Sequence, residues 1–284
     1  MKTLLTALLP CLLLIGCGGS STTDATITNT NTNTNPVTTP GSGDWYKPGV
    51  STTWQLQLQG TVNTGYDVEL YDIDLFDTPA QTIADLHAAG HHVLCYFSGG
   101  SYEDWRPDAT QFAASDLGNA LDGWPGERWL DIRSTALRDI MSARLDLAAD
   151  KGCDGVDVDN MDGFVNNSGF ALTANDQLAY NRYIANAAHD RRLAIALKND
   201  LDQIGDLADA FDLAVNEECF DYNECDLLTP FVQQGKPVLQ VEYKPIYTND
   251  ATARAELCTQ SLSQQFSTLI LPLALDDAFR FSCR

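Results

Sequence analysis

Strand-like and helix-like stretches alternate along most of the chain, and this alternation limits the possible folds more than any other feature. Helix-like stretches have apolar residues three to four positions apart and include residues 78–89, 134–151 and 173–191. Strand-like runs lie between stretches of this kind, at 68–76, 92–98, 128–132, 155–160, 193–199, 213–218, 237–243 and 268–275. An α/β chain with this pattern over residues 44–284 predicts a (β/α)8 TIM barrel.

Residues 54–58 alternate between polar and apolar ahead of this pattern, so we expect an extra N-terminal strand there. A doubly wound open sheet is the alternative arrangement of alternating strands and helices. Sheets of that kind often carry a GxGxxG loop after the first strand, and this sequence has none. The barrel is therefore the favoured fold.

Polar side chains gather at the carboxyl end of nearly every predicted strand, where a (β/α)8 barrel carries its active site. They are Asp72 and Asp74, Tyr96 and Ser98, Asp157 and Asp159, Lys198 to Asp200, Asn216 to Glu218, Glu242 and Tyr243, and Asp276 and Asp277. Solubility explains one such strand end, but it does not explain seven together. The pattern favours one active face with many carboxylates, a lysine and several aromatic rings.

Residues 155–163, with the sequence GVDVDNMDG, carry a dense group of acids. Two valines alternate with Asp157 and Asp159, so one face of the strand is apolar and the other carries two carboxylates. Because burying an unpaired charge is costly, these acids face a wet cleft or are compensated by cations and hydrogen bonds. A solvated turn after the strand is the simpler alternative. A Mg²⁺ or Ca²⁺ site built from Asp157, Asp159 and Asp162 is a competing use of the same acids.

The residue types at the strand ends are typical of glycoside hydrolysis. The sequence lacks a GxSxG motif, a phosphate-binding glycine loop and a nucleotide-cofactor fingerprint, and no cysteine or histidine spacing indicates zinc. We therefore expect neither a cofactor nor a metal. Glycosidases use one carboxylic acid to protonate the leaving oxygen and a second carboxylate to attack the sugar or activate water. The strands at 155–160 and 213–218 supply the best pair, because their ends face each other across the barrel mouth.

Four segments occur in the order expected for one known family. They are YDIDLFD at 71–77, CYFSGGSYEDWR at 95–106, GCDGVDVDN at 152–160 and VNEEC at 215–219. They resemble hallmark segments of glycoside hydrolase family 114, the endo-α-1,4-polygalactosaminidases, and the resemblance extends over about residues 45–284. It implies a (β/α)8 barrel that cleaves α-1,4-linked, galactosamine-containing polysaccharide with retention of anomeric configuration.

The same resemblance implies the two catalytic residues. The acid that ends the strand at 155–160 is Asp159, the expected nucleophile, and the acid after Asn216 is Glu217, the expected general acid/base. Strand parity alone leaves Glu218 open, because Glu218 faces the lumen if Ala214 and Asn216 do. The family pattern favours Glu217, since it places the acid directly after the asparagine.

Asp157 stands where many relatives carry glutamate, so we expect it to orient Asp159 or Lys198. Lys198 can keep these carboxylates ionised by lowering their pKa, although an ordinary inter-strand salt bridge is the alternative. Asp72 and Asp74 can bind the ammonium group of a deacetylated sugar. Further candidates for substrate binding are Glu242, for hydroxyl or amine groups, and the rings of Tyr96, Trp105 and Tyr243, for stacking.

Residues 1–16 are predicted to be a lipoprotein signal peptide. Lys2 precedes an apolar run at 4–15 that is too short to span a bilayer. The sequence LIGC that ends at Cys17 resembles a bacterial lipobox, which implies cleavage before Cys17 and lipidation of its sulfur; an ordinary signal peptide is the alternative. Residues 17–43 form a flexible linker. We expect the mature protein to be anchored by lipid to the cell envelope, at the outer membrane or cell surface, or to be secreted.

The formal net charge of −22 narrows the choice of partners. It disfavours nucleic acid and anionic membrane surfaces, so the only expected membrane contact is the lipid anchor. A cationic, galactosamine-rich polysaccharide suits this charge, although general solubility explains it equally well. We expect a monomer. A polysaccharide-binding lipoprotein without activity and a glycosidase for another α-linked galactoside polymer are the alternative functions.

The cysteines also indicate export. After loss of the signal peptide and lipidation of Cys17, six cysteines remain, and an even number in an exported protein suggests disulfides. Local loop closure predicts a Cys219–Cys225 disulfide, and tethering of the C-terminus predicts a Cys258–Cys283 disulfide. Cys95 and Cys153 either form a third disulfide or remain buried thiols.

Overall fold

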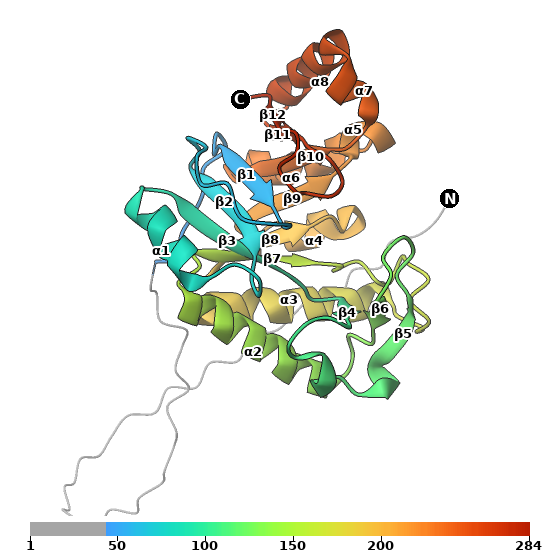
Figure 1. Ribbon diagram of the computed structural model, residues 1–284. Helices are drawn as coiled ribbons and strands as arrows, with labels where there is room; N and C mark the ends of the chain where they lie inside the picture. The colour runs from blue at the N-terminus through green and yellow to red at the C-terminus, as the bar shows by residue number, and fades with distance from the viewer. Residues whose placement is uncertain (1–43) are drawn as a thin grey trace, which may run out of the picture. The chain divides into compact units, whose positions relative to one another are not determined.

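Nine strands within the described residues, 44–284, form one curled and mostly parallel sheet in the computed structural model (Figure 1). In spatial order they are β1 (Trp54–Gln57), β2 (Leu70–Asp74), β3 (His92–Ser98), β7 (Gly155–Asp159), β8 (Ala194–Lys198), β9 (Leu213–Glu217), β10 (Val238–Glu242), β11 (Ser267–Ile270) and β12 (Phe281–Ser282). Strands β1 to β11 of this sheet run parallel to their neighbours, and β12 pairs antiparallel with β11. The predicted signal peptide at 1–16, Cys17 and the linker to residue 43 lie outside the described residues.

Helices connect the parallel strands. They are α1 (Ala80–Ala88), α2 (Thr135–Lys151), α3 (Ala174–Asp190), α4 (Ile204–Leu207), α5 (Cys219–Tyr222), α6 (Thr229–Gln233), α7 (Pro245–Asn249) and α8 (Ala251–Ser263). The helices predicted at 78–89, 134–151 and 173–191 are confirmed as α1, α2 and α3. Helix α3 starts at a capping box between Thr173 and Asp176, and α2 ends at Gly152, whose positive φ of 87° favours glycine.

The two faces of the sheet pack against different partners, because side chains alternate along each strand. One face carries residues such as Leu70, Leu94 and Val215, which pack against one another on the inside of the curled sheet. The other face carries residues such as Phe97 and Val158, which pack against apolar residues of the helices. This alternation decides which polar residues at the strand ends point inward and which point outward.

Strand β1 corrects the expectation for residues 54–58. It is not an additional strand outside the repeat, since it pairs parallel with β2 and starts the main sheet. Side chains also connect β1 to the far parallel strand β11. Trp54 Nε1 donates to the carbonyl oxygen of Ser267 at 2.8 Å, and Ser267 Oγ donates to the carbonyl oxygen of Thr52 at 2.6 Å.

The strand predicted at 128–132 does form, but its assignment to the barrel is wrong. It is β6 (Glu127–Leu130), which lies between β4 (Ser101–Glu103) and β5 (Leu117–Ala120) in a separate antiparallel sheet. A parallel strand in an α/β fold is covered on both faces, whereas Arg128 is exposed and donates to backbone oxygens of β5. The small sheet stands beside the carboxyl ends of the parallel strands (Figure 1).

Three disulfides connect cysteines of the described residues. Cys219–Cys225 and Cys258–Cys283 confirm the two predicted pairs, and Cys95–Cys153 settles the open one by joining β3 to the residues before β7. None of the helices between residues 44 and 284 combines the length and apolar character that crossing a membrane requires.

Candidate active site

An open cavity of about 980 Å³, the main cavity, lies at the carboxyl ends of the parallel strands. Strand ends that are far apart in sequence meet there. The predicted site residues that line it are Asp74, Tyr96, Trp105, Asp157, Asp159, Lys198, Glu217 and Tyr243. Of the other two predicted substrate-binding residues, Asp72 is fully buried beside Asp157, and Glu242 is fully buried away from the cavity.

The end of β7 is held in place by the glycines after β3. The backbone N–H groups of Gly99 and Gly100 both donate to the carbonyl oxygen of Asp159, at 2.9 and 3.1 Å. A Cβ atom on Gly100 would collide with the carbonyl oxygen of Asn160, so only glycine fits this approach. The Gly-Gly pair therefore fixes the backbone that presents the Asp159 carboxylate.

Lys198 lies between the two predicted catalytic carboxylates. Its Nζ is 3.1 Å from Asp159 Oδ1 and 3.2 Å from Glu217 Oε2. Burial lowers the pKa of Lys198, but the carboxylates of Asp159, Glu217 and Asp157 outweigh burial and raise it well above its usual value. Lys198 is therefore a fixed positive charge in the centre of the site.

The Asp159 carboxylate is held ionised. Tyr96 donates its hydroxyl to Oδ2 at 2.7 Å, and the N–H of Asn160 donates to Oδ1 at 2.8 Å. Burial raises the pKa of Asp159, but Lys198 and these two hydrogen bonds outweigh it, so the pKa is lower than usual. An ionised carboxylate facing an open cavity is able to act as a nucleophile.

The Glu217 carboxylate has its own set of donors. Tyr243 donates its hydroxyl to Oε1 at 2.5 Å, and Asn199 donates its side-chain N–H to Oε2 at 3.2 Å. The side-chain oxygen of Asn199 accepts the backbone N–H of Glu217 at 3.0 Å, so Asn199 fixes both ends of this residue. Tyr96 and Tyr243, expected as stacking rings, thus use their hydroxyls to position the two acids.

Asp72 and Asp157 form a buried acid pair. Both side chains are almost completely buried, and neither oxygen of Asp72 has a hydrogen-bond donor in the surrounding protein. Burial, followed by the neighbouring Asp157, raises the pKa of Asp72 well above its usual value. Burial also raises the pKa of Asp157 to about 7, although Lys198 opposes it. Burial therefore favours the protonated form of Asp72, which can share a proton with Asp157.

The carboxylate of Asp74 is already paired with an arginine. Arg106 Nη1 and Nη2 donate to its two oxygens at 3.0 and 2.7 Å, and Arg106 Nε donates to Glu103 at 2.8 Å. All three side chains are buried. Asp74 and Arg106 form a bidentate ion pair that joins β2 to the loop after β4. Asp74 supports the wall of the main cavity and has little capacity left for a sugar.

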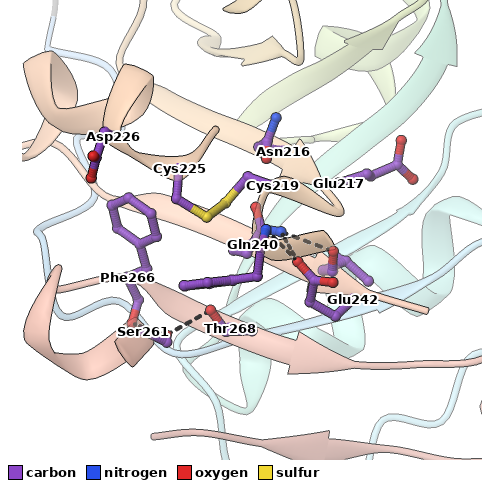
Figure 2. Close-up of a disulfide and its surroundings, with 12 residues drawn as sticks. Asn216, Glu217, Cys219, Cys225, Asp226, Gln240, Glu242, Ser261, Phe266 and Thr268 are labelled. Carbon is purple, nitrogen blue, oxygen red and sulfur yellow. Dashed lines mark hydrogen bonds between the residues drawn. A yellow bond between two sulfur atoms is a disulfide. The ribbon is translucent and has the colours of Figure 1, made fainter. Parts of the chain in front are cut away.

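Glu242 and Glu218 lie outside the main cavity, because successive side chains along a strand point to opposite faces. Glu242 points to the helix-covered face, where it accepts hydrogen bonds from the Phe220 N–H and from Gln240, both at 2.9 Å. Figure 2 shows Glu217 extending away from the Gln240–Glu242 pair. Glu218 is the next residue after Glu217, with a left-handed φ of 59°, and lines a neighbouring pocket instead.

Aromatic residues stand at the rim of the main cavity. Trp105 and Trp124 line it with 51% and 49% of their surface exposed, which suits stacking on sugar rings. Trp124 and the buried Glu127 in the cavity wall were not among the residues predicted from the sequence. Trp124-Pro125-Gly126 is a turn-like tripeptide beside a strand, and an exposed tryptophan in such a turn was the available signal.

The competing metal site is not formed. Between residues 44 and 284, no three His, Cys, Asp or Glu side chains are grouped so that they could hold a metal ion. Asp157 and Asp159 are instead compensated by Asp72, Lys198 and Tyr96.

Comparison with known proteins gives the family. The model of glycoside-hydrolase family GH114 matches residues 35–284. An uncharacterized protein of Deinococcus radiodurans is 30% identical over 292 residues, which cover 90% of this chain and 93% of that protein.

The solved structures that are similar to this chain include those of two proteins. One is Aspergillus fumigatus Ega3 in complex with galactosamine, which is 44% identical, has a TM-score of 0.81 and covers 85% of this chain and 99% of its own. The glycoside hydrolase domain of PelA from Pseudomonas aeruginosa shares the fold at 16% identity, with a TM-score of 0.65 and coverage of 81% of this chain and 98% of its own. The chain belongs to glycoside-hydrolase family GH114 and is a glycoside hydrolase of the endo-α-1,4-polygalactosaminidase type.

Proposed function

We propose that the protein is an endo-acting, retaining hydrolase of α-1,4-linked, galactosamine-containing polysaccharide. The observation that carries this proposal is the position of Lys198 between the carboxylates of Asp159 and Glu217 in an open cavity. Asp159 is the nucleophile and Glu217 the general acid/base. The closed (β/α)8 barrel that places these residues at one mouth is part of the same proposal, and the contacts between β1 and β11 support it.

The spacing of the two acids favours retention. Because Asp159 and Glu217 both contact Lys198 Nζ, the two contacting oxygens lie at most about 6.3 Å apart. Retaining glycosidases have carboxyl groups about 5–5.5 Å apart, and inverting enzymes need about 6.5–9.5 Å to admit a water. The geometry therefore favours direct attack of Asp159 on the anomeric carbon.

The roles of the two acids follow from their contacts. Glu217 protonates the leaving glycosidic oxygen while Asp159 attacks and forms a covalent ester. Esterification removes the charge of Asp159, so the Lys198 ammonium then stabilises the Glu217 carboxylate. In this ionised form Glu217 takes a proton from the water that hydrolyses the ester, which returns the enzyme to its starting state.

The substrate class follows from the charge of the cavity. Most of the charged side chains that line the cavity are carboxylic acids, and the net charge of the chain is −22. A polymer carrying ammonium groups is attracted to such a site. The similarity to Ega3, which was solved with galactosamine, supports galactosamine as the sugar. Asp72, Asp74 and Glu242, which were expected to bind the substrate, act as buried supports.

The proposal includes export of the chain. Three disulfides in the described residues are typical of an oxidising compartment. Cleavage of a signal peptide at 1–16 and lipidation of Cys17 would anchor residues 44–284 to the cell envelope through the linker at 17–43. Metabolic labelling with a radioactive fatty acid tests this: label on the wild type and none on Cys17→Ser is expected, and an unlabelled wild type contradicts it.

Product release from a panel of polymers tests the activity. The panel contains deacetylated α-1,4-galactosamine polymer, its N-acetylated form and a neutral α-linked galactan. We expect oligosaccharides from the galactosamine polymer with wild type, and at least about a 1,000-fold lower rate with Asp159→Asn or Glu217→Gln. Glu256→Gln, on the surface of α8, is the matched control and should behave as wild type. Cleavage of the neutral galactan alone would instead indicate a glycosidase for another α-galactoside.

A further inference from the structure

The segment at 98–101, with the sequence SGGS, connects β3 to β4 and lies against the end of β7. Its two glycines bind the carbonyl oxygen of Asp159 through their N–H groups. Its two serines bind the side chain of Asn160, whose Nδ2 is 2.9 Å from Ser98 Oγ and 3.2 Å from Ser101 Oγ. The segment therefore holds both the proposed nucleophile and the residue that follows it.

Asn160 has a left-handed backbone conformation, with a φ of 60°. Asparagine tolerates this conformation better than most residues that have a Cβ atom. The Asn160 N–H donates to Oδ1 of Asp159 at 2.8 Å, and the Asn160 carbonyl oxygen packs against Gly100. The position of Asn160 therefore decides whether the Asp159 carboxylate keeps one of its hydrogen bonds.

Glu127, in β6, connects the separate antiparallel sheet to the two serines. Glu127 Oε2 accepts the hydroxyl of Ser101 at 2.7 Å, and Ser101 Oγ lies 2.7 Å from Ser98 Oγ. We call this continuous set of hydrogen bonds the hydroxyl chain; its members are Glu127, Ser101, Ser98 and Asn160. Both serines are almost completely buried, so solvent does not replace their partners.

The direction of the hydroxyl chain is set by Glu127. A carboxylate only accepts hydrogen bonds, so the single hydroxyl proton of Ser101 points to Glu127. Ser98 must then donate to Ser101, which leaves both serine oxygens as acceptors for the Asn160 amide. Without an acceptor at position 127 the hydroxyls are free to rotate, and a hydroxyl proton that points toward Asn160 repels its Nδ2 group. Glu127 therefore acts on Asn160 through the two serines.

The Asn160 N–H is one of the groups that keep Asp159 ionised. Burial raises the pKa of Asp159, whereas Lys198, the Tyr96 hydroxyl and the Asn160 N–H lower it, in that order. The other ionisable groups that interact with Asp159 are Asp72, Glu127, Asp157, Asp162 and Tyr243. Replacing the two serines leaves all of these groups in place, so a change in the pKa of Asp159 then reports on the hydrogen bond.

We propose that the hydroxyl chain positions the Asp159 carboxylate for attack, and that Glu127 is a positioning residue that acts through it. This inference rests on the proposed role of Asp159 as the nucleophile. The Glu127 N–H also donates to the carbonyl oxygen of Trp124 at 3.1 Å, so the chain begins in the turn that carries a tryptophan of the cavity rim. The separate antiparallel sheet thus takes part in the reaction.

Removing the two hydroxyls tests the chain without changing any charge. Ser98→Ala/Ser101→Ala is compared with Ser261→Ala/Thr268→Val, which removes another buried pair of hydroxyls, 2.6 Å apart, on α8 and β11 (Figure 2). We expect the chain variant to lose about tenfold in kcat/KM, and the acidic limb of its pH–rate profile to move up by about one pH unit. The control should show neither change, even if its melting temperature falls equally. An unmoved acidic limb in the chain variant would overturn the proposal.

A second pair of variants tests Glu127 itself. Glu127→Gln and Glu127→Met remove the same charge and are similar in size, but only glutamine still accepts a hydrogen bond from Ser101. We expect kcat/KM of Glu127→Met to be about tenfold lower than that of Glu127→Gln, with the acidic limb at a higher pH. Equal rates and equal acidic limbs would refute a role of Glu127 through the chain.

An NMR titration separates this inference from the proposed function. The resonance of the Asp159 carboxyl carbon is assigned by its loss in Asp159→Asn, and it is followed with pH in wild type and in Ser98→Ala/Ser101→Ala. We expect a higher pKa of Asp159 in the serine variant whether or not polymer is cleaved, and equal pKa values would refute the chain. Absence of hydrolysis by wild type would refute the proposed function, while this comparison would still decide the hydroxyl chain.

Discussion

Replacing Lys198 by methionine removes the charge on which the site depends. Each of its contacts, at 3.1 Å to Asp159 and 3.2 Å to Glu217, corresponds to a Coulomb attraction of about 5 kcal/mol at an effective dielectric constant of about 20. Dehydration of the buried ammonium offsets much of this attraction. Breaking a buried ion pair from one side costs about 3–5 kcal/mol, because the partner charges remain uncompensated.

The Lys198→Met variant should therefore lose about 100- to 5,000-fold in kcat/KM. Without the ammonium, burial and the neighbouring acids raise the pKa of Asp159, so the acidic limb of the pH–rate profile moves to higher pH. The assay is reducing-end release from deacetylated α-1,4-galactosamine polymer between pH 4 and 8. Lys47→Met, at an exposed position, is the control.

The stability of Lys198→Met should depend on pH in the opposite direction to that of a protein with an ordinary ion pair. In the wild type the lowered pKa of Asp159 contributes stability above the unfolded value of about 4 and loses it only as pH falls further. In Lys198→Met the raised pKa makes stability fall as pH rises above the unfolded value of about 4. Loss of less than about tenfold in kcat/KM, with an unmoved acidic limb, would refute this account of Lys198.

Three further predictions concern the supports of the site. Tyr243→Phe removes the hydroxyl that donates to Glu217 and should lower kcat/KM by about tenfold or more without changing the melting temperature much, and an unchanged rate would contradict the positioning role. Asp72→Asn should flatten the dependence of the melting temperature on pH between 5 and 8. The raised pKa of Asp72 makes wild type lose stability as pH rises above about 4, whereas asparagine does not titrate, so an unchanged pH slope would show that Asp72 is ionised. Removing the Cys95–Cys153 disulfide, which joins residues 58 positions apart, should lower the free energy of unfolding by about 4 kcal/mol, against about 2 kcal/mol for Cys219–Cys225, which joins residues 6 apart. Urea unfolding of the two double alanine variants measures this difference, and equal losses would contradict the loop-length argument.

Local patterns in the sequence predict the helices and strands well, because the spacing of apolar residues in each one reflects which of its faces are buried. Helix α2 alternates apolar and charged residues with helical spacing, and buried parallel strands such as β8 are continuous apolar runs. No comparable local pattern shows which distant strands pair with each other. The run at 128–132 is a strand as predicted, but its partners are β4 and β5, which follow the turn at Gly99–Gly100.

The same limit applies to individual site residues. Asp74 has the sequence environment of a substrate-binding acid, and only the structure shows that Arg106, 32 positions away, occupies it. Glu242 and Tyr243 end one strand, and alternation requires that they face opposite sides, so parity could have excluded Glu242. The role of Asp72 could not be predicted from the sequence. Its raised pKa results from burial, and the residue type alone does not reveal burial.

We propose that Asp159 attacks the sugar and that Glu217 transfers the proton. An aryl α-galactosaminide oligosaccharide with a good leaving group separates the two roles, because its departure needs no acid catalysis. With azide added, Glu217→Ala should form the α-glycosyl azide through the intact Asp159 ester. Asp159→Ala should form the β-glycosyl azide by a single displacement at the vacated face. NMR of the azide products reads the anomeric configuration directly, and the α-azide from Asp159→Ala would contradict the assignment of Asp159 as the nucleophile.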